Sequence, residues 1–317
     1  MKKTLLLLLL PFSLSAQVDL DSVLVLVNQK SYVKAEYHLN RFLENNVASN
    51  KALELKADVL AYQKKWDEAS EIYYSLVEEN PKSANFHYKY GGVLALKALE
   101  VNKLRALLLL DDIKSSFLKA AQLDKKHIDV RWALIELYMH LPGIVGGSNE
   151  KALFYADELE RISKVDGYLS KGYVYEYTEQ PNQAEYYYKK AIVEGGSVVC
   201  YSKLYSFYEN QGAGDKAIEV IQESQLRHHR NALHYQLGKV SAEFNLQLDK
   251  GERCLLTYIE NYTEKDGVPL SWAYYRLAQI YQHKQNKSKA IAYINLAVDG
   301  DSQIALFQKK KEEIQEL

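Results

Sequence analysis

Cysteine and proline are scarce in this sequence, and their scarcity narrows the fold class. Two cysteines, Cys200 and Cys254, and five prolines occur among 317 residues. Two distant cysteines do not make the disulfide framework that small secreted domains use to supplement a core. Few prolines suit a mostly helical chain, since a proline inside a helix costs about 3 kcal/mol. Apolar residues do not alternate with polar ones along the sequence, as they would in strands, but recur every three or four residues, as in helices. We therefore expect an all-α protein.

Long apolar runs are missing beyond the first residues. The chain opens with Lys2 and Lys3, continues with an apolar run from Leu5 to Leu10, and reaches small residues that end at Ala16. This pattern is typical of a short bacterial signal peptide, and its apolar part is shorter than the roughly 20 helical residues that span a bilayer. We therefore expect removal of residues 1–16 after export through the Sec pathway, to the periplasm or alternatively outside the cell. We expect no transmembrane segment in the mature chain.

A strong charge of one sign is absent as well. The chain has 40 basic and 41 acidic residues, a formal net charge of −1. A near-neutral chain lacks the positive charge that non-specific nucleic-acid binders use to hold phosphates. We therefore expect no nucleic-acid partner.

Motifs of catalytic and metal chemistry are also missing. Gly-x-Ser-x-Gly, His-Glu-x-x-His and Cys-x-x-Cys do not occur. His228, His229 and His234 do not share one helical face, so we interpret them as solvated side chains rather than metal ligands. The stretch from Gly143 to Ser148 lacks the Gly-Lys-Ser/Thr of a phosphate loop and is interpreted as a long turn, with Ser148 capping the next helix. We expect no enzymatic activity, no cofactor and no metal.

What the sequence does contain is a repeat. The clearest unit, 50–83, pairs a helix carrying small Ala57 with a helix carrying small Ala69 and aromatic Tyr73, and Pro81 follows the second helix. Ala35 precedes Ala69 by 34 residues and marks an earlier unit. Small residues at these positions let two antiparallel helices approach closely, while large residues fill the space beside them. The sequence therefore predicts an array of helix pairs.

The same pattern recurs along the chain. We expect about eight pairs, at 17–49, 50–83, 84–126, 127–164, 165–197, 198–230, 231–268 and 271–302. In the unit at 84–126 the stretch between the two helices is about ten residues too long for the repeat, so one or both helices must be extended. Residues 17–302 are then one repeat domain. Gln303–Leu317 is predicted to be a charged amphipathic helix that caps the last pair.

These residues resemble the tetratricopeptide-repeat family over nearly all of the mature chain. The run from Pro142 to Ser148 further resembles a bacterial exported subgroup without an assigned activity. The resemblance implies a right-handed α-solenoid whose first helices line an inner groove that binds peptides or partner proteins. It implies no enzymatic role by itself, and fold analogy does not name the partner.

The resemblance also indicates which side chains of the first helices face that groove. Aromatic rings with polar edges suit such a surface, because they bury much area with few rotors to freeze. Ten residues take these positions and are predicted to bind a partner: Tyr88, Trp132, Glu136, Tyr173, Tyr177, Tyr235, Lys239, Trp272, Tyr275 and Gln279.

Two functional hypotheses remain open at this stage. The first is an exported scaffold or adaptor that binds a protein or peptide in the groove. The alternative is a soluble receptor for a small molecule or glycan, with Trp132 and Trp272 as stacking platforms. Self-association through end repeats or grooves is compatible with either hypothesis.

Overall fold

The structure is a computed structural model that describes residues 20–46 and 49–316. The expected signal peptide at 1–16 lies outside the described residues, as do the start of the first expected unit and Leu317. Among the described residues, every regular element is helical, and no helix is long and apolar enough to cross a membrane.

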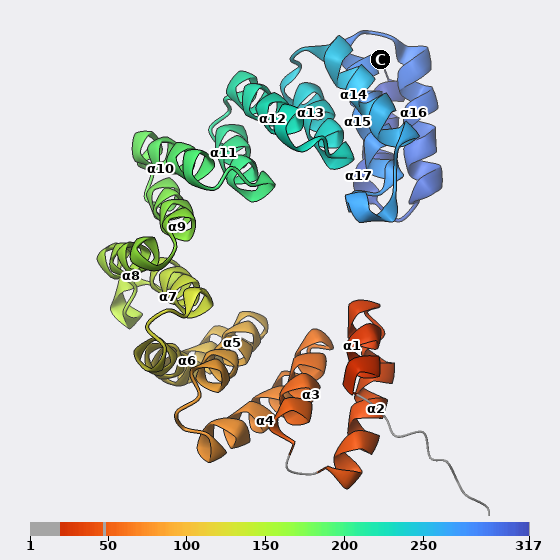
Figure 1. Ribbon diagram of the computed structural model, residues 1–317. Helices are drawn as coiled ribbons and strands as arrows, with labels where there is room; N and C mark the ends of the chain where they lie inside the picture. The colour runs from red at the N-terminus through yellow and green to blue at the C-terminus, as the bar shows by residue number, and fades with distance from the viewer. Residues whose placement is uncertain (1–19, 47–48, 317) are drawn as a thin grey trace, which may run out of the picture. The chain divides into compact units, whose positions relative to one another are not determined.

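Within these described ranges, the α-helices form eight consecutive pairs followed by one last helix (Figure 1). They are α1 (Leu20–Asn28), α2 (Tyr32–Asn45), α3 (Asn50–Tyr62), α4 (Trp66–Glu79), α5 (Ala84–Glu100), α6 (Lys103–Leu123), α7 (Ile128–His140), α8 (Asn149–Ile162), α9 (Lys164–Tyr177), α10 (Pro181–Glu194), α11 (Val198–Asn210), α12 (Gly214–His228), α13 (Asn231–Phe244), α14 (Leu248–Glu260), α15 (Leu270–His283), α16 (Lys287–Gly300) and α17 (Ala305–Gln315). Two single turns of 3₁₀-helix occur at Gly143–Val145 and Glu264–Asp266. The expected all-α array is confirmed.

The described residues fall into two compact units that divide within α7, between Leu137 and Tyr138; the part before this point is here called unit 1 and the part after it unit 2. In unit 1, each helix from α1 to α6 packs on the next. In unit 2, the same holds from α8 to α17, and the first helices of adjacent pairs also touch, α9 with α11 and α13 with α15. Each unit is therefore held mainly by contacts between neighbours along the chain, as in other repeat proteins.

Small residues bring the two helices of a pair together. A Cβ atom added to Gly172 would lie 2.5 Å from the ring of Tyr188, and one added to Gly238 would lie 2.3 Å from Leu255 Cγ. Ala69 is fully buried beside Tyr73 on α4. These positions therefore have the steric role that the repeat pattern predicts.

The turn inside most pairs has one backbone conformation. Lys30, Lys64, Glu179, Gly212 and Asn245 adopt positive φ, between 55° and 71°. The amide of the following residue donates to the carbonyl five residues back, as from residue 65 to 60 and from 180 to 175. This arrangement is a Schellman motif, which satisfies carbonyls that the helix end leaves unpaired. The repeat is therefore present in backbone geometry even where glycine is not used.

In the long repeat expected at 84–126, both helices are extended. Helix α5 has 17 residues and α6 has 21, against 13 to 15 in the pairs of unit 2. In the Gly143–Ser148 stretch, Gly147 is required because a Cβ atom would lie 1.7 Å from the carbonyl oxygen of Leu141. Ser148 caps α8 by accepting a hydrogen bond from the Lys151 amide, as the sequence predicts.

The last helix covers the apolar end of the array. Phe307 and Ile314 on α17 are fully buried, in one cluster with Tyr275 and Ile294. Charged residues occupy the opposite face of α17. A terminal helix that is apolar on one side and charged on the other is what a repeat array needs at its end.

Two adjacent glycines of α5 test whether helix proximity, rather than glycine itself, is what the fold requires. A Cβ atom at Gly91 would lie 2.9 Å from the Phe117 ring, whereas one at Gly92 would have no atom within 4 Å. Gly92→Ala should raise the free energy of unfolding by up to about 1 kcal/mol, because alanine favours helix. Gly91→Ala should be about 1–3 kcal/mol less stable than that control, because of overpacking. Urea denaturation followed by circular dichroism measures both, and equal effects would contradict the close packing.

Candidate functional site

In unit 1, the structure brings two of the predicted residues together. The Tyr88 ring on α5 lies 4.9 Å from the ring of His127, centroid to centroid. Burial raises the pKa of Tyr88, and the negative charges of Asp129 and Glu136 raise it further. Glu136 is exposed on α7, and Trp132 on the same helix is half-buried. Tyr88 and Glu136 are therefore neighbours on the first helices of this unit.

In unit 2, Tyr173 and Tyr177 form a cluster with a histidine. The Tyr173 hydroxyl is hydrogen-bonded to His140 Nε2 at 3.0 Å. The His140 ring stands edge-on to Tyr177, with centroids 5.4 Å apart, and the two tyrosine rings are 6.5 Å apart. We call His140, Tyr173 and Tyr177 the aromatic cluster. Tyr177 is 49% exposed, so the cluster presents ring surface to solvent while its members fix one another.

The other predicted aromatic residues of unit 2 are packed inside it. Tyr235 is 5% exposed and Tyr275 is 3% exposed. Tyr235 packs on Tyr258, and Tyr275 stacks on Phe307 at 5.1 Å. A partner could reach either ring only after the side chain left the core. Binding by these two tyrosines remains a prediction, and the structure gives each a packing role.

Trp272 also packs against the terminal helix. Its ring stands edge-on to Phe307, with centroids 5.0 Å apart, and edge-on to Tyr275 at 5.8 Å. The side chain is half-buried between the apolar clusters of α13–α15 and α15–α17. This packing leaves only part of the ring surface for a ligand.

Lys239 and Gln279 belong to a chain of polar contacts that joins three first helices. Glu209 on α11 accepts from Lys239 on α13 at 3.0 Å. Glu243, one turn after Lys239, pairs with Arg276 on α15 at 2.7 Å, and Arg276 donates to Gln279 at 2.8 Å. We call these five residues the polar chain. Sequence reasoning did not single out Glu209 or Arg276, although each stands 30 or 33 residues from its partner, close to one repeat.

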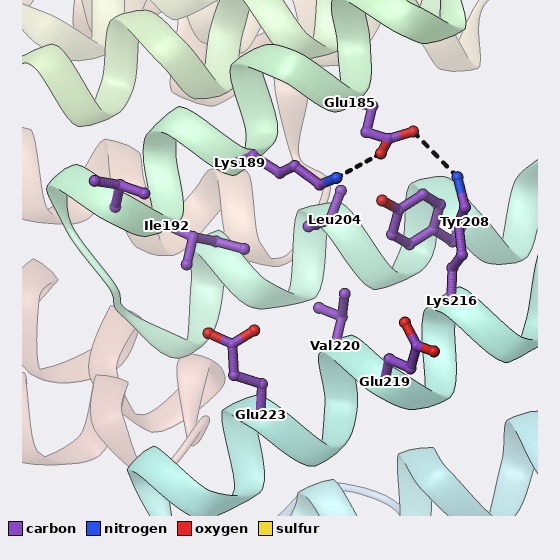
Figure 2. A pocket seen from close by; sticks show the side chains of 10 residues that line it. Glu185, Lys189, Ile192, Leu204, Tyr208, Lys216, Glu219, Val220 and Glu223 are labelled. Atoms are coloured by element: carbon purple, nitrogen blue, oxygen red, sulfur yellow. Dashed lines mark hydrogen bonds and ion pairs between the residues drawn. The ribbon is translucent and has the colours of Figure 1, made fainter.

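A pocket of about 490 Å³ lies among α10, α11 and α12, and sequence reasoning missed it (Figure 2). Glu185 pairs with Lys189 at 2.6 Å and with Lys216 at 3.5 Å on one side of it. Apolar side chains, Leu204 and Val220 among them, line another part of it, together with the carboxylates of Glu219 and Glu223. The full lining is Glu185, Lys189, Ile192, Val193, Leu204, Tyr208, Lys216, Glu219, Val220 and Glu223. The available signal was the Glu185–Lys189 pair, four residues apart on one helical face.

The charged wall of this pocket shifts two titrating groups. Burial raises the pKa of Tyr208 to about 12, helped by its hydrogen bond with Glu185 and that residue's negative charge. Burial also acts to raise the pKa of Glu185, but hydrogen bonds from Lys189 and Tyr208 and the two lysine charges hold it below its ordinary value of 4.5. Both side chains are therefore bound into the pocket wall. Among the described residues, no group of acidic, histidine and cysteine side chains could hold a metal ion.

Comparison with known proteins gives the fold. No protein-family model matches the chain, and no curated protein matches it. A tetratricopeptide-repeat protein from Parabacteroides merdae matches with a TM-score of 0.52 and 12% identity, over 93% of this chain and 97% of that one.

Two further solved structures are similar to a smaller degree. YrrB, a TPR protein with an unusual peptide-binding site, has a TM-score of 0.43 and 20% identity, over 62% of this chain and 97% of that one. TTC0263 from Thermus thermophilus, a thermophilic TPR protein, has a TM-score of 0.36 and 16% identity, over 76% of this chain and 97% of that one. At these TM-scores neither likeness bears on function. The match to the Parabacteroides protein is what shows that this chain has the tetratricopeptide-repeat fold.

The lowered pKa of Glu185 predicts a pH-dependent contribution to stability. A carboxyl whose folded pKa is depressed stabilises the fold above its unfolded pKa, and this contribution is lost as pH falls through the folded value. Glu185→Gln should therefore lower the free energy of unfolding at pH 7, and its difference from wild type should shrink below the ordinary value of 4.5. Urea denaturation between pH 7 and pH 3 measures this.

Glu219→Gln is the matched control, because Glu219 lines the same pocket but has no ion pair with any described residue. Its difference from wild type should be small throughout. A Glu185→Gln difference that stays constant from pH 7 to pH 3 would show that the ion pairs contribute nothing to stability.

Proposed function

We propose that this chain is an exported scaffold that binds a partner protein or peptide on the first helices of unit 2. The observation that carries the proposal is the aromatic cluster of His140, Tyr173 and Tyr177. Its rings hold one another in place, and Tyr177 is half exposed. Surfaces of this kind suit transient protein binding, because little side-chain freedom is lost when a partner covers them.

The neighbouring groups indicate what kind of partner fits. A pocket of about 340 Å³, lined by Glu176, Glu179, Pro181 and Gln211, lies at the end of α9 that carries Tyr177. Glu176 is fixed there by hydrogen bonds from Tyr188 at 2.8 Å and Asn210 at 2.9 Å. Two carboxylates near the exposed Tyr177 favour a cationic side chain, which can approach both a negative charge and an aromatic face. We therefore propose a peptide segment that carries lysine or arginine next to an apolar residue.

The export part of the proposal is supported by the N-terminal pattern. A basic start, a short apolar run and small residues ending at Ala16 are typical of a cleaved signal peptide. The mature protein should then begin at Gln17 and reside in the periplasm, or alternatively outside the cell. The resemblance of the Pro142–Ser148 run to an exported subgroup points the same way.

The alternative, a small-molecule or glycan receptor, is favoured by the pocket among α10, α11 and α12. Its volume of about 490 Å³ falls within the range of roughly 300–1,000 Å³ that small-molecule sites occupy. Stacking on Trp272 has less support, because that ring already packs on Phe307 and Tyr275. A receptor function would therefore use the pocket of Figure 2 rather than the tryptophan.

A pair of exposed tyrosines gives the sharpest test of the scaffold. Peptides selected on the whole chain from a random display library are titrated against wild type, Tyr177→Ala and Tyr186→Ala by fluorescence polarisation. Tyr177 on α9 is 49% exposed and Tyr186 on α10 is 54% exposed, so the two truncations are matched. Tyr177→Ala should raise Kd by about fivefold or more, the effect of a contact worth over 1 kcal/mol, and Tyr186→Ala should leave it nearly unchanged.

Three other results would count against the proposal. Equal losses in both variants would show that binding does not use the aromatic cluster. Selected peptides without basic residues would contradict the proposed role of Glu176 and Glu179. Thermal stabilisation by a metabolite or glycan library that is lost in Val220→Glu, with no peptide selected, would move the receptor function to first place.

A further inference from the structure

Five leucines lie exposed on the extended helix pair α5–α6, and the proposed function makes no use of them. Leu99 is 82% exposed and Leu108 is 80% exposed, and the set also includes Leu96, Leu104 and Leu107. They stand at the end of α5 and the start of α6, on either side of a turn of two residues. We call these five residues the leucine patch. Apolar side chains gathered in this way on a surface mark an interaction site more often than scattered ones do.

The hairpin that carries the patch is fixed to the rest of unit 1. Glu100, at the end of α5, accepts from Lys64 at 2.6 Å and from the Trp66 indole at 2.7 Å. Lys97 on the preceding turn pairs with Asp67 on α4. Asn102 caps α6 by accepting from the Arg105 amide. The leucines therefore lie on a helical hairpin whose position is fixed by these contacts. The two helices of this hairpin are longer than the helices of the other pairs.

The exposed leucines of α6 have basic residues at one end and acidic residues at the other. Lys103 and Arg105 stand at the start of the exposed leucines of α6, and Asp111 and Asp112 stand at their end. All four are exposed, and none forms an ion pair with any residue that the structure describes. Over the stretch from Lys103 to Asp112, the first half of α6, the surface therefore runs from positive, through apolar, to negative.

We propose that the leucine patch is the interface with a second copy of this chain, in which the two α6 helices pack antiparallel. A twofold axis near Leu107 and Leu108 sets leucine against leucine at the centre. It also sets Lys103 and Arg105 of each copy against Asp111 and Asp112 of the other. An interface of this symmetry must be self-complementary, and a helix that is basic at one end and acidic at the other meets that condition.

The same charges disfavour an anionic lipid surface as the occupant. Lys103 and Arg105 would be attracted to it, but Asp111 and Asp112 lie on the same exposed stretch and would be repelled. Only an occupant with the reverse order of charges satisfies both ends. A second copy has that order when it runs antiparallel. This inference is independent of the peptide site on unit 2.

Sedimentation equilibrium of the whole chain is the first test. As concentration rises, the mass of the wild type should approach twice that of its monomer. Leu108→Glu should raise the dimer dissociation constant by at least about tenfold, because it places a charge in the apolar centre of the interface. Leu226→Glu, at an equally exposed leucine on α12 (76% against 80%), should leave the dimer unchanged.

Charge reversal then tests the antiparallel arrangement. The acidic variant K103E/R105E and the basic variant D111K/D112K should each dimerise more weakly, because like charges then meet at both ends. An equal mixture of the two variants should dimerise about as well as wild type, because every contact at both ends again joins opposite charges. Restoration on mixing requires direct contact between the two stretches.

Three results would overturn the proposal. A chain that stays monomeric up to about 100 µM, where even a weak specific dimer would form, has no such interface. A dimer that Leu108→Glu and Leu226→Glu affect equally is held elsewhere. A monomeric chain that binds vesicles of phosphatidylglycerol, and loses that binding in K103E/R105E, uses the leucine patch on lipid instead.

Discussion

The close approach of the two helices in each pair is the constraint on which the other features depend. At Gly238 the backbone of α13 comes so near α14 that an added Cβ atom would lie 2.3 Å from Leu255. Tight turns join the helices of most pairs, and in these turns Lys64 and Glu179 adopt positive φ without being glycine. Beside each close contact, large side chains such as Tyr188 fill the remaining space between the two helices. Surface chemistry can then vary, because the core of each pair does not depend on it.

The sequence predicts the fold well because its main signal is steric and local. Ala35, Ala69 and Ala184 take the same position in the second helix of their pairs, and each is fully buried where the two helices meet. The extra length of the unit at 84–126 was also visible in the sequence. Its distribution over both α5 and α6 was not, because the leucines that lengthen them make little contact with the core and so have no packing pattern.

The candidate site was harder to predict, because side-chain exposure depends on neighbours that a single repeat does not contain. Tyr177 is exposed as expected, whereas Tyr275 is covered by Phe307 from α17. On a helix one residue corresponds to about 100°, so a small error of register turns a surface position into a buried one. The pocket of Figure 2 was not predictable from the sequence for a related reason. Three helices contribute to its lining, with Glu185, Leu204 and Val220, and no sequence motif joins these residues.

The bonds between successive repeats have a consequence for how the chain folds. Glu209 and Lys239 are 30 residues apart, and the pairs Tyr173–His140 and Arg276–Glu243 each span 33. Their partners are therefore synthesised within about one repeat of each other. Loops of this length close at low entropic cost, and proteins built from such local contacts fold fast. During synthesis, which starts at the N-terminus, each new helix pair can pack on the pairs already formed. Only α17, the last helix, packs after the whole chain has been made.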